Sequence, residues 1–299
     1  MESGGDAHEH DLRDAAIAVW REWLVVVHKP RRLAMVKERD ELRKTTSRAN
    51  ANLAAGHDFS LALRHDGNIA CWGLNDNGEA PPDGTQGDFI MVDAGLSHTL
   101  ALQRNGSIAC WGFNYDGQAP PDGIQGDFVA IAAGSYHTLA IRRDGSIACW
   151  GNNGSGQAPP DGIQGDFVMV AAGSSHSLAP QRDGNIACWG RNAHGQAPRD
   201  GIQGDFVAIA AGFNHSLALQ RDGNIASWGL NSYGQAPPDG IQGDFVAIAA
   251  GAFHSLALRR DGSIACWGDN DNGEAPTPED DDYATLSANF PLMTDLHIV

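Results

Sequence analysis

Five histidines recur at intervals of 39 residues, and this repeated set of imidazoles is the feature of the sequence closest to a chemical centre. They are His98, His137, His176, His215 and His254, with Phe59 at the corresponding place of the first copy. Imidazole nitrogen is a common ligand for zinc and other transition metals. Copies 39 residues apart fall on different structural units, however, and cannot converge on one ion. We therefore expect no metal and predict structural histidines that hydrogen-bond the backbone near a strand start.

The cysteines follow the same spacing, and Ser227 replaces one of them. They are Cys71, Cys110, Cys149, Cys188 and Cys266. Equivalent positions on separate units lie farther apart than the roughly 7 Å between Cα atoms that a disulfide spans. An odd count with wide spacing is typical of free thiols in a reducing compartment. We expect buried, unpaired cysteines that pack as small apolar side chains.

Charged side chains also form repeated sets, but these sets do not make a catalytic group. Arginine precedes the Asp-Gly or Asn-Gly pair in five copies, at Arg104, Arg143, Arg182, Arg221 and Arg260. We expect these arginines to neutralise nearby aspartates, although a ring of arginines also suits an acidic partner. Paired aspartates beside Gly and Pro, beginning with Asp83 and Asp88, indicate turns. The sequence holds no phosphate-binding loop and no nucleophile motif, so we expect neither a catalytic residue nor a cofactor.

All these side chains belong to a unit of 39 residues that is repeated six times after residue 50. The tryptophans mark it, at Trp72, Trp111, Trp150, Trp189, Trp228 and Trp267. Each unit holds three short apolar runs, as at residues 245–249, 254–258 and 264–267, with Gly-rich segments between them. The runs predict strands, and the Asp-Gly pair between the second and third runs predicts a hairpin turn.

Neither face of the predicted strands is polar, since Ile264 and Cys266 share one face and Ala265 and Trp267 the other. A sheet that is apolar on both faces must be covered on both sides, as blades arranged radially achieve. A period near 40 without a helical pattern favours this arrangement. We predict an all-β fold, a β-propeller of six 39-residue blades. Residues 282–288 repeat the first strand once more and predict either a partial seventh blade or a C-terminal strand that closes the ring.

The strings Ala-Gly-x-x-His-Ser-Leu-Ala-Leu and Asp-Gly-x-Ile-Ala-Cys-Trp-Gly-x-Asn-x-x-Gly-Gln resemble the repeats of the regulator of chromosome condensation family. The resemblance extends over residues 51–288. It implies a propeller that binds proteins and, as an enzymatic alternative, guanine nucleotide exchange on a small GTPase. The candidate partners are accordingly proteins, a small GTPase or a ubiquitin-pathway protein among them. The strict spacing leaves no room for an inserted wedge between blades, which disfavours exchange activity.

The charge of the chain divides near residue 50. The chain has 20 basic and 37 acidic residues, a formal net charge of −17, whereas residues 1–50 hold ten basic and nine acidic side chains. The repeats therefore carry the negative charge, which disfavours bulk nucleic-acid binding by the propeller. No run of 18 apolar residues and no secretory signal pattern occurs. We expect no membrane segment and an intracellular location, cytoplasmic or alternatively nuclear.

Residues 1–50 predict a helical arm, which we separate from the propeller at 51–288 and from a C-terminal tail at 289–299. An apolar stripe at helical spacing ends at Pro30 and consists of Ile17, Trp20, Leu24 and Val27. A second, basic helix is expected from residue 31 to residue 44. The stripe either packs against the propeller or a second copy, or binds a second protein such as a calmodulin-like partner.

Comparison of the six copies with one another shows where they differ. Two dipeptides vary, one after the Ala-Gly and one after the Trp-Gly-x-Asn. Counting strand reversals places both at the same end of the blades, opposite the Asp-Gly turns. Aromatic side chains there are the usual anchors of protein interfaces. We predict a partner-binding rim made of Leu96, Tyr115, Tyr136, His194, Phe213, Asn214, Tyr233 and Phe253. The alternative is neutral drift in the loops of recently duplicated copies.

Overall fold

The computed structural model describes residues 53–271, 273 and 275, and within them every regular element is a β-strand. The predicted helical arm, the strand repeat at 282–288 and the C-terminal tail lie outside the described residues. No helix in the described part is long and apolar enough to cross a membrane. The repeats therefore fold as predicted, as an all-β structure.

Eighteen strands form six three-stranded antiparallel sheets, which we number as blades 1 to 6 in chain order. The first strands of the blades are β1 (Leu53–Ala55), β4 (Phe89–Ala94), β7 (Phe128–Ala133), β10 (Ala171–Ala172), β13 (Phe206–Ala211) and β16 (Phe245–Ala250). The second strands are β2 (Phe59–Leu63), β5 (His98–Gln103), β8 (His137–Arg142), β11 (His176–Pro180), β14 (His215–Gln220) and β17 (His254–Arg259). The third strands are β3 (Ile69–Gly73), β6 (Ile108–Gly112), β9 (Ile147–Gly151), β12 (Ile186–Gly190), β15 (Ile225–Gly229) and β18 (Ile264–Gly268).

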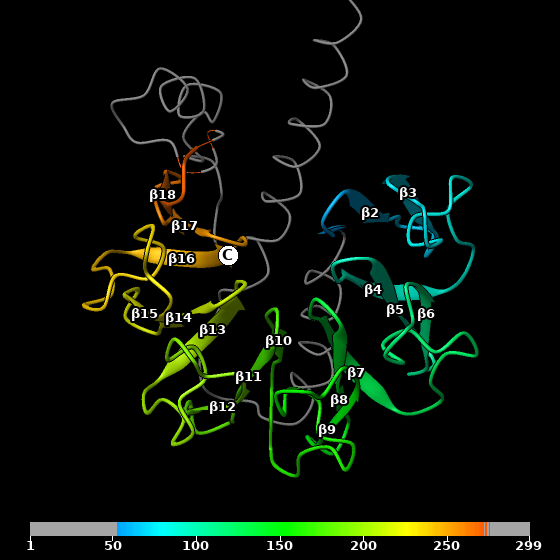
Figure 1. Ribbon diagram of the computed structural model, residues 1–299, viewed down its shortest axis with the longest axis horizontal. Coiled ribbons are helices and arrows are strands. Elements are labelled where there is room, and N and C mark those ends of the chain that lie inside the picture. The colour runs from blue at the N-terminus through cyan, green and yellow to red at the C-terminus, as the bar shows by residue number, and fades with distance from the viewer. Residues whose placement is uncertain (1–52, 272, 274, 276–299) are drawn as a thin grey trace, which may run out of the picture.

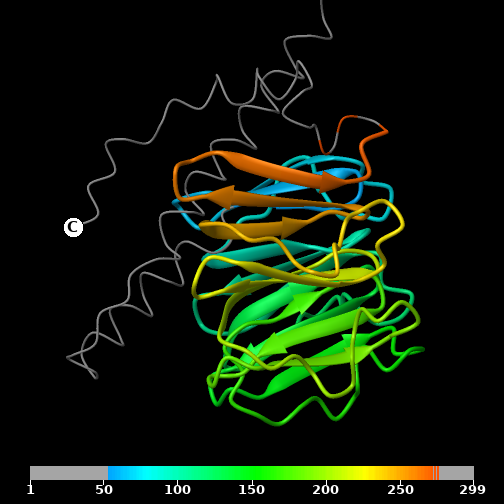
Figure 2. The same ribbon diagram turned by 90° about the vertical axis from the view of Figure 1, so that its left-hand side faces the viewer.

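Figure 1 shows these blades as an arc, with the first strand of each blade nearest the centre and blades 1 and 6 at the two ends. The strands of successive blades run side by side, so the loops gather at two opposite ends of the molecule (Figure 2). The arc agrees with a six-bladed propeller in which both faces of the inner blades are covered by neighbours.

The turn between the second and third strands explains why the hairpin forms at the predicted place. In blade 1 the Gly67 amide donates to the Arg64 carbonyl at 3.0 Å, and Gly67 has a φ of 84°. Such a φ is readily adopted only by glycine. The Asp66 carboxylate accepts the Asn68 amide at 3.0 Å and fixes the same turn.

Packing between blades makes the core, because the first strand of each blade lies against the first two strands of the blade before it. Between blades 2 and 3, for example, Leu100, Ile108 and Cys110 of one sheet pack with Phe128 and Ile131 of the next. Side chains on both faces of the inner sheets are therefore buried, as the apolar pattern of both faces predicts.

The linker between blades adds no regular fourth strand. It contacts the outer edge of the third strand through one bridged pair in each of the first five blades, as at Ile69 and Thr85. Blade 4 departs further, since its first strand is only two residues long. Pro180 in the paired strand takes the place of Leu219 in blade 5. Proline has no N–H to donate to the ladder, which explains the shortened strand.

Candidate functional site

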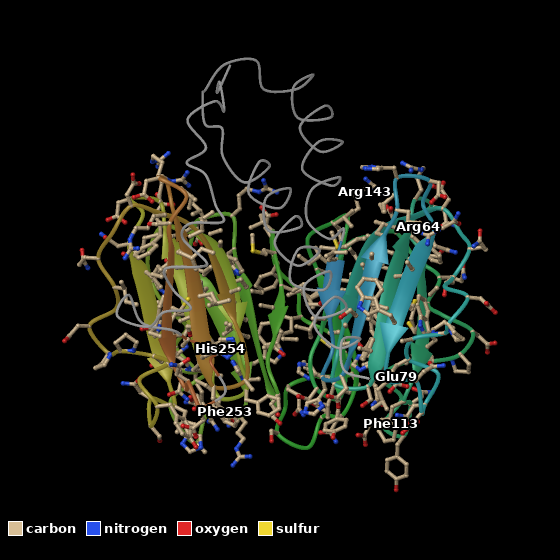
Figure 3. All side chains as sticks on the ribbon, turned by 90° about the horizontal axis from the view of Figure 1, so that it is seen from above. Arg64, Glu79, Phe113, Arg143, Phe253 and His254 are labelled. Carbon is tan, nitrogen blue, oxygen red and sulfur yellow. The ribbon has the colours of Figure 1, made fainter. Side chains whose placement is uncertain are left out.

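The loops of the blades divide into two ends with different character (Figure 3). Arg64 and Arg143 lie at one end with the Asp-Gly turns, and Phe113 and Phe253 lie at the other. The second end carries two loops of each blade, which we call the inner loop, between first and second strands, and the outer loop, after the third strand. We name this end the variable rim. It is the end on which the sequence comparison placed both variable dipeptides.

The outer loops have one rigid frame, built from the residues that all copies share. An asparagine side chain accepts a backbone amide five residues later in every blade, as Asn114 does from Ala119 at 2.8 Å. In four blades the glutamine at the loop end accepts the amide two residues earlier, as Gln118 does from Asp116 at 3.0 Å. Gly117, at a φ of 80°, lets the chain turn between them. Variable side chains therefore project from a fixed backbone.

Aromatic side chains meet at the junction of blades 2 and 3. Phe113 and Tyr115 of the outer loop of blade 2 stack with ring centroids 6.4 Å apart. The Phe113 ring also meets Tyr136, from the inner loop of blade 3, edge to face at 6.1 Å. Tyr115 is 88% exposed and Tyr136 39% exposed. We call these three residues the first aromatic cluster.

A second aromatic cluster lies at the junction of blades 5 and 6 and consists of Phe213, Tyr233 and Phe253. The Phe253 ring is 5.6 Å from Phe213, edge to face, and 5.6 Å from Tyr233. Tyr233 is exposed and both phenylalanines are half-buried. The variable rim between the clusters carries small and polar side chains, such as Ser174, Ser175 and Arg191 of blade 4.

The other three predicted binding residues lie outside the two clusters. His194 is exposed, whereas Leu96 is half-buried, and its carbonyl accepts the His57 amide of the neighbouring blade at 3.3 Å. Asn214 accepts the Gln196 side-chain amide at 3.2 Å, so it supports the loop frame. Phe113, which joins Tyr115 to Tyr136, was missed by the sequence comparison. It occupies the x of Trp-Gly-x-Asn, a third position that differs between copies and could have been included.

Four of the five repeated histidines join neighbouring blades through a side-chain hydroxyl, and for these four the prediction that the imidazole bonds to backbone was wrong. Their Nε2 atoms lie 2.9–3.2 Å from a hydroxyl of the next blade, in the pairs His98–Thr138, His137–Ser177, His176–Ser216 and His215–Ser255. Each hydroxyl also donates to a backbone carbonyl of the preceding blade, as Thr138 does to Gln118 at 2.9 Å. Because the hydroxyl hydrogen is used there, the imidazole must be the donor, through Nε2–H.

This arrangement keeps the imidazoles neutral. His98, His137, His176 and His215 are completely buried, and their Nδ1 atoms have no hydrogen-bond partner among the described residues. Burial lowers the pKa of His137 to about 3 and that of the other three to about 4. Protein-bound metal would need several such side chains together, and no group of three metal-ligating side chains occurs in the described residues.

The tryptophans complete the same junction. Trp111 Nε1 donates to the Glu79 carbonyl of blade 1 at 2.9 Å, and Thr99 Oγ1 donates to the same carbonyl at 2.8 Å. The pattern recurs at the next four junctions. In blade 1, at the end of the arc, Ser60 Oγ and Trp72 Nε1 have no such acceptor among the described residues. Ser60 is half-buried where its five equivalents are completely buried.

The opposite end of the blades is held by exposed ion pairs, as predicted for the repeated arginines. Arg104, Arg143, Arg182, Arg221 and Arg260 pair with Asp88, Asp127, Asp166, Asp205 and Asp244 at 2.6–2.9 Å. The bond from Arg143 lowers the pKa of Asp127. These arginines are therefore engaged within their own blades.

The five cysteines are free, and burial raises the pKa of Cys110, Cys149 and Cys188 to about 12.

Comparison with known structures identifies the same architecture in other proteins. Prp20p from Saccharomyces cerevisiae, whose structure was described with its binding properties to Gsp1p and histones, matches with a TM-score of 0.60 at 21% identity. That match covers 72% of this chain and 71% of that chain. The ectodomain of the Physcomitrella patens receptor kinase CR4 matches with a TM-score of 0.60 at 23% identity, over 75% and 65% of the two chains. Human WBSCR16 matches with a TM-score of 0.61 at 19% identity, over 73% and 76%.

Identities this low establish a shared fold. Comparison with curated protein sequences gives no match. The family model of the regulator of chromosome condensation (RCC1) repeat matches six segments, at residues 51–79, 90–118, 128–157, 167–196, 206–235 and 245–274. These segments cover more than half of the chain and coincide with the six blades. The chain therefore belongs to the regulator of chromosome condensation (RCC1) repeat family.

Proposed function

We propose that this protein is an interaction propeller, a scaffold or regulatory module that binds a protein partner through the variable rim. The observation that carries the proposal is the gathering of aromatic side chains into two exposed clusters on that rim. Large aromatic side chains dominate the binding energy of protein interfaces because they bury much apolar area and lose few rotamers. The rim differs in this respect from the opposite end, where the five repeated arginines are already paired with aspartates.

The rigidity of the loops supports the same proposal. Shared asparagine, glutamine and glycine residues fix the outer-loop backbone, so little conformational entropy is lost when a partner orders the rim. Tyr115 and Tyr233 project into solvent from this frame. Partners of small GTPase or ubiquitin-pathway type are candidates, and the acidic propeller favours a partner with a basic surface.

Substitution of exposed tyrosines tests the proposal without disturbing the core. The variant Tyr115→Ser/Tyr136→Ser removes the exposed part of the first cluster, and Tyr233→Ser reduces the second. The control Arg143→Ser/Arg182→Ser alters the opposite end. In quantitative affinity purification from cells, we expect the tyrosine variants to lose a set of proteins that the wild type and the control retain. Unchanged partners in both tyrosine variants, with unchanged melting temperatures, would refute a binding role for the rim.

Guanine nucleotide exchange on a small GTPase is the second candidate. Family membership and the similarity of fold to Prp20p support it, since Prp20p was studied for its binding to Gsp1p. The equal length of all six repeats counts against it, because no segment is inserted between the blades that could act as a wedge. A nucleotide-release assay with a panel of small GTPases separates the candidates. The interaction propeller predicts no acceleration of release by catalytic amounts of the protein.

We also propose roles for the parts at the ends of the chain. Residues 1–50 bind a second protein, and the protein works in the cytoplasm, with the nucleus as the alternative. The near-neutral charge of these residues, beside an acidic repeat region, supports a separate role. Affinity purification with and without residues 1–50 tests the arm, and imaging of the tagged full chain tests the location.

A further inference from the structure

One first-strand position differs in blade 2 from every other copy. Asp93 lies in β4, whereas the equivalent residues of the other five blades are Ala54, Ala132, Ala171, Ala210 and Ala249. Five alanines show that the fold does not need a carboxylate at this place. Asp93 is half-buried in the strand nearest the centre of the arc, where a charged group is costly unless it is hydrogen-bonded.

The Asp93 carboxylate ties two blades together through backbone amides. Its Oδ1 accepts the amide of Ala94 at 2.9 Å. Its Oδ2 accepts the amide of Ala133, the last residue of β7 in blade 3, at 2.8 Å. Bonds from an ionised acceptor are stronger than neutral ones. An alanine cannot make them, so this tie is present at one junction of the described blades.

The tie ends beside the first aromatic cluster. Ala133 is followed by Gly134, Ser135 and Tyr136, which form the inner loop of blade 3. Tyr136 lies against Phe113 of blade 2. The carboxylate bond and the aromatic contact therefore both cross from blade 2 to blade 3. On the side of blade 3 they involve Ala133 and Tyr136, which are three residues apart in the chain.

We propose that Asp93 is a positioning residue for the variable rim: its bond to the Ala133 amide fixes the inner loop of blade 3 so that Tyr136 stands against Phe113. The inference rests on the proposed function of the rim. It assigns to Asp93 the control of one part of that rim, the first aromatic cluster. Protonation of Asp93 weakens the bond, because a neutral carboxyl is a poorer acceptor than a carboxylate. The first cluster is then held less firmly.

The surroundings make this carboxylate responsive near neutral pH. Burial raises the pKa of Asp93 to about 6, although the two amides act in the opposite direction. The strands packed against β4 are β1, β2, β5 and β7. Among them only β5 carries a titratable side chain, His98, which burial keeps neutral by lowering its pKa to about 4. Within the described residues facing Asp93, the charge that changes between pH 7 and pH 5 is its own.

A stability measurement distinguishes positioning from a purely structural role. Because the folded-state pKa lies above the ordinary 3.8, the ionised carboxylate destabilises the fold at pH 7. The variant Asp93→Ala restores the residue of the other five blades and should raise the melting temperature at pH 7 by about 2–4 °C or more. A lower melting temperature of Asp93→Ala would contradict the raised pKa of Asp93 and overturn the pH response that the proposal assigns to the loop.

Amide exchange read by NMR on the full chain provides the local test. At pH 7 we expect the Ala133 amide to exchange about tenfold faster in Asp93→Ala than in the wild type, as for loss of one charged hydrogen bond. The Ser135 amide of the inner loop, which donates to the Gly173 carbonyl at 3.2 Å, should also exchange faster. Between pH 7 and pH 5, protection corrected for intrinsic rates should fall further at Ala133 in the wild type than in Asp93→Ala, because acid destabilisation through the buried histidines is common to both proteins. The matched variant Ala132→Asp should protect Ala172 in blade 4. Equal exchange in the wild type and Asp93→Ala overturns the proposal whatever the rim binds.

Binding of the rim partner then separates this inference from the proposed function. If Tyr136→Ser and Asp93→Ala both weaken binding at pH 7, and wild-type binding weakens toward pH 5 more than that of Asp93→Ala, the proposal holds. Loss of binding in Tyr136→Ser with none in Asp93→Ala overturns the role of Asp93 and leaves the rim as the binding site. If neither variant changes binding, the proposed function fails at this cluster.

Discussion

The buried histidines between blades predict that the protein loses most of its stability between pH 7 and pH 5. His98, His137, His176 and His215 each donate Nε2–H to the next blade and are neutral in the fold. Protonation would place an uncompensated charge at a completely buried site. In the unfolded chain these histidines bind protons with a pKa of 6.5, whereas in the folded protein the pKa of His98, His176 and His215 is about 4.

The size of the loss follows from linkage. A group whose pKa is depressed in the fold contributes its full stability above the unfolded pKa and loses it as pH falls toward the folded pKa. At pH 5 each histidine lowers the free energy of unfolding by about 2 kcal/mol, and the four together lower it by about 8 kcal/mol. Asp93, whose pKa is raised to about 6, acts in the opposite direction: its protonation between pH 7 and pH 5 raises the free energy of unfolding by about 1 kcal/mol. The net loss is comparable with the whole stability of an ordinary domain, about 5–15 kcal/mol.

Urea unfolding at half-unit steps from pH 8 to pH 5 measures this loss. The matched variant is His137→Phe, because Phe59 occupies the same position in blade 1, packed against Gly56 as His137 packs against Gly134. We expect this variant to lose about a quarter less stability than the wild type on acidification, since one of four coupled protons is removed. A stability that stays flat between pH 7 and pH 5, or an unchanged slope in His137→Phe, would refute the assignment of neutral connecting histidines.

Three further predictions compare copies of one position. Trp111→Phe should lower the free energy of unfolding in urea by about 1–2 kcal/mol, because it leaves the Glu79 carbonyl with one donor fewer. Trp72→Phe should lower it little, because the Trp72 Nε1 has no such acceptor among the described residues. Equal losses in the two variants would contradict the bonding described at the blade junctions. Gly112→Ala should lower the melting temperature far more than Gly117→Ala, because the added Cβ would lie 2.7 Å from the Ser97 carbonyl oxygen at Gly112 and meets nothing within 4 Å at Gly117; Gly117→Ala should cost only the about 1 kcal/mol of its positive φ. Cys110, Cys149 and Cys188, with pKa values raised to about 12, should be alkylated by iodoacetamide at pH 8 only after unfolding in urea, as read by mass spectrometry, and rapid alkylation of native protein would show that these sites open.

The sequence predicts the structure of a blade unusually well because the same 39-residue unit occurs in six copies. Apolar runs such as residues 245–249 recur in register, so a chance pattern in one copy is corrected by the other five. The Asp-Gly pairs locate the hairpins because glycine alone tolerates the φ of 84–91° found at Gly67 and its equivalents. The position of the variable loops at one end follows from counting strands, and this end is where Phe113 and Phe253 lie.

What repetition cannot reveal is the contact between different copies. Nothing in the string His-Ser-Leu-Ala-Leu says that a histidine bonds to the hydroxyl of the next blade, 40 residues later, as His137 does to Ser177. That contact depends on the angle between sheets, which no local propensity encodes. Phe113 was missed for a similar reason, because its importance comes from reaching Tyr136 across a junction. Asp93 was overlooked because a single Asp among five Ala has no spacing pattern.

The junction chemistry also explains why the rim is free to vary. The acceptor for Trp111 and Thr99 is the backbone carbonyl of Glu79 and not its side chain, so residues at the loop tip can change without loss of a contact between blades. Drift and selection are therefore both tolerated there, and the distribution of side chains must decide between them. Drift in independent loops would scatter large aromatic residues singly around the arc. Instead, every Phe or Tyr at a variable rim position belongs to one of two clusters, and each cluster draws its members from two adjacent blades. Clusters that need two loops to agree favour selection for a binding surface over drift.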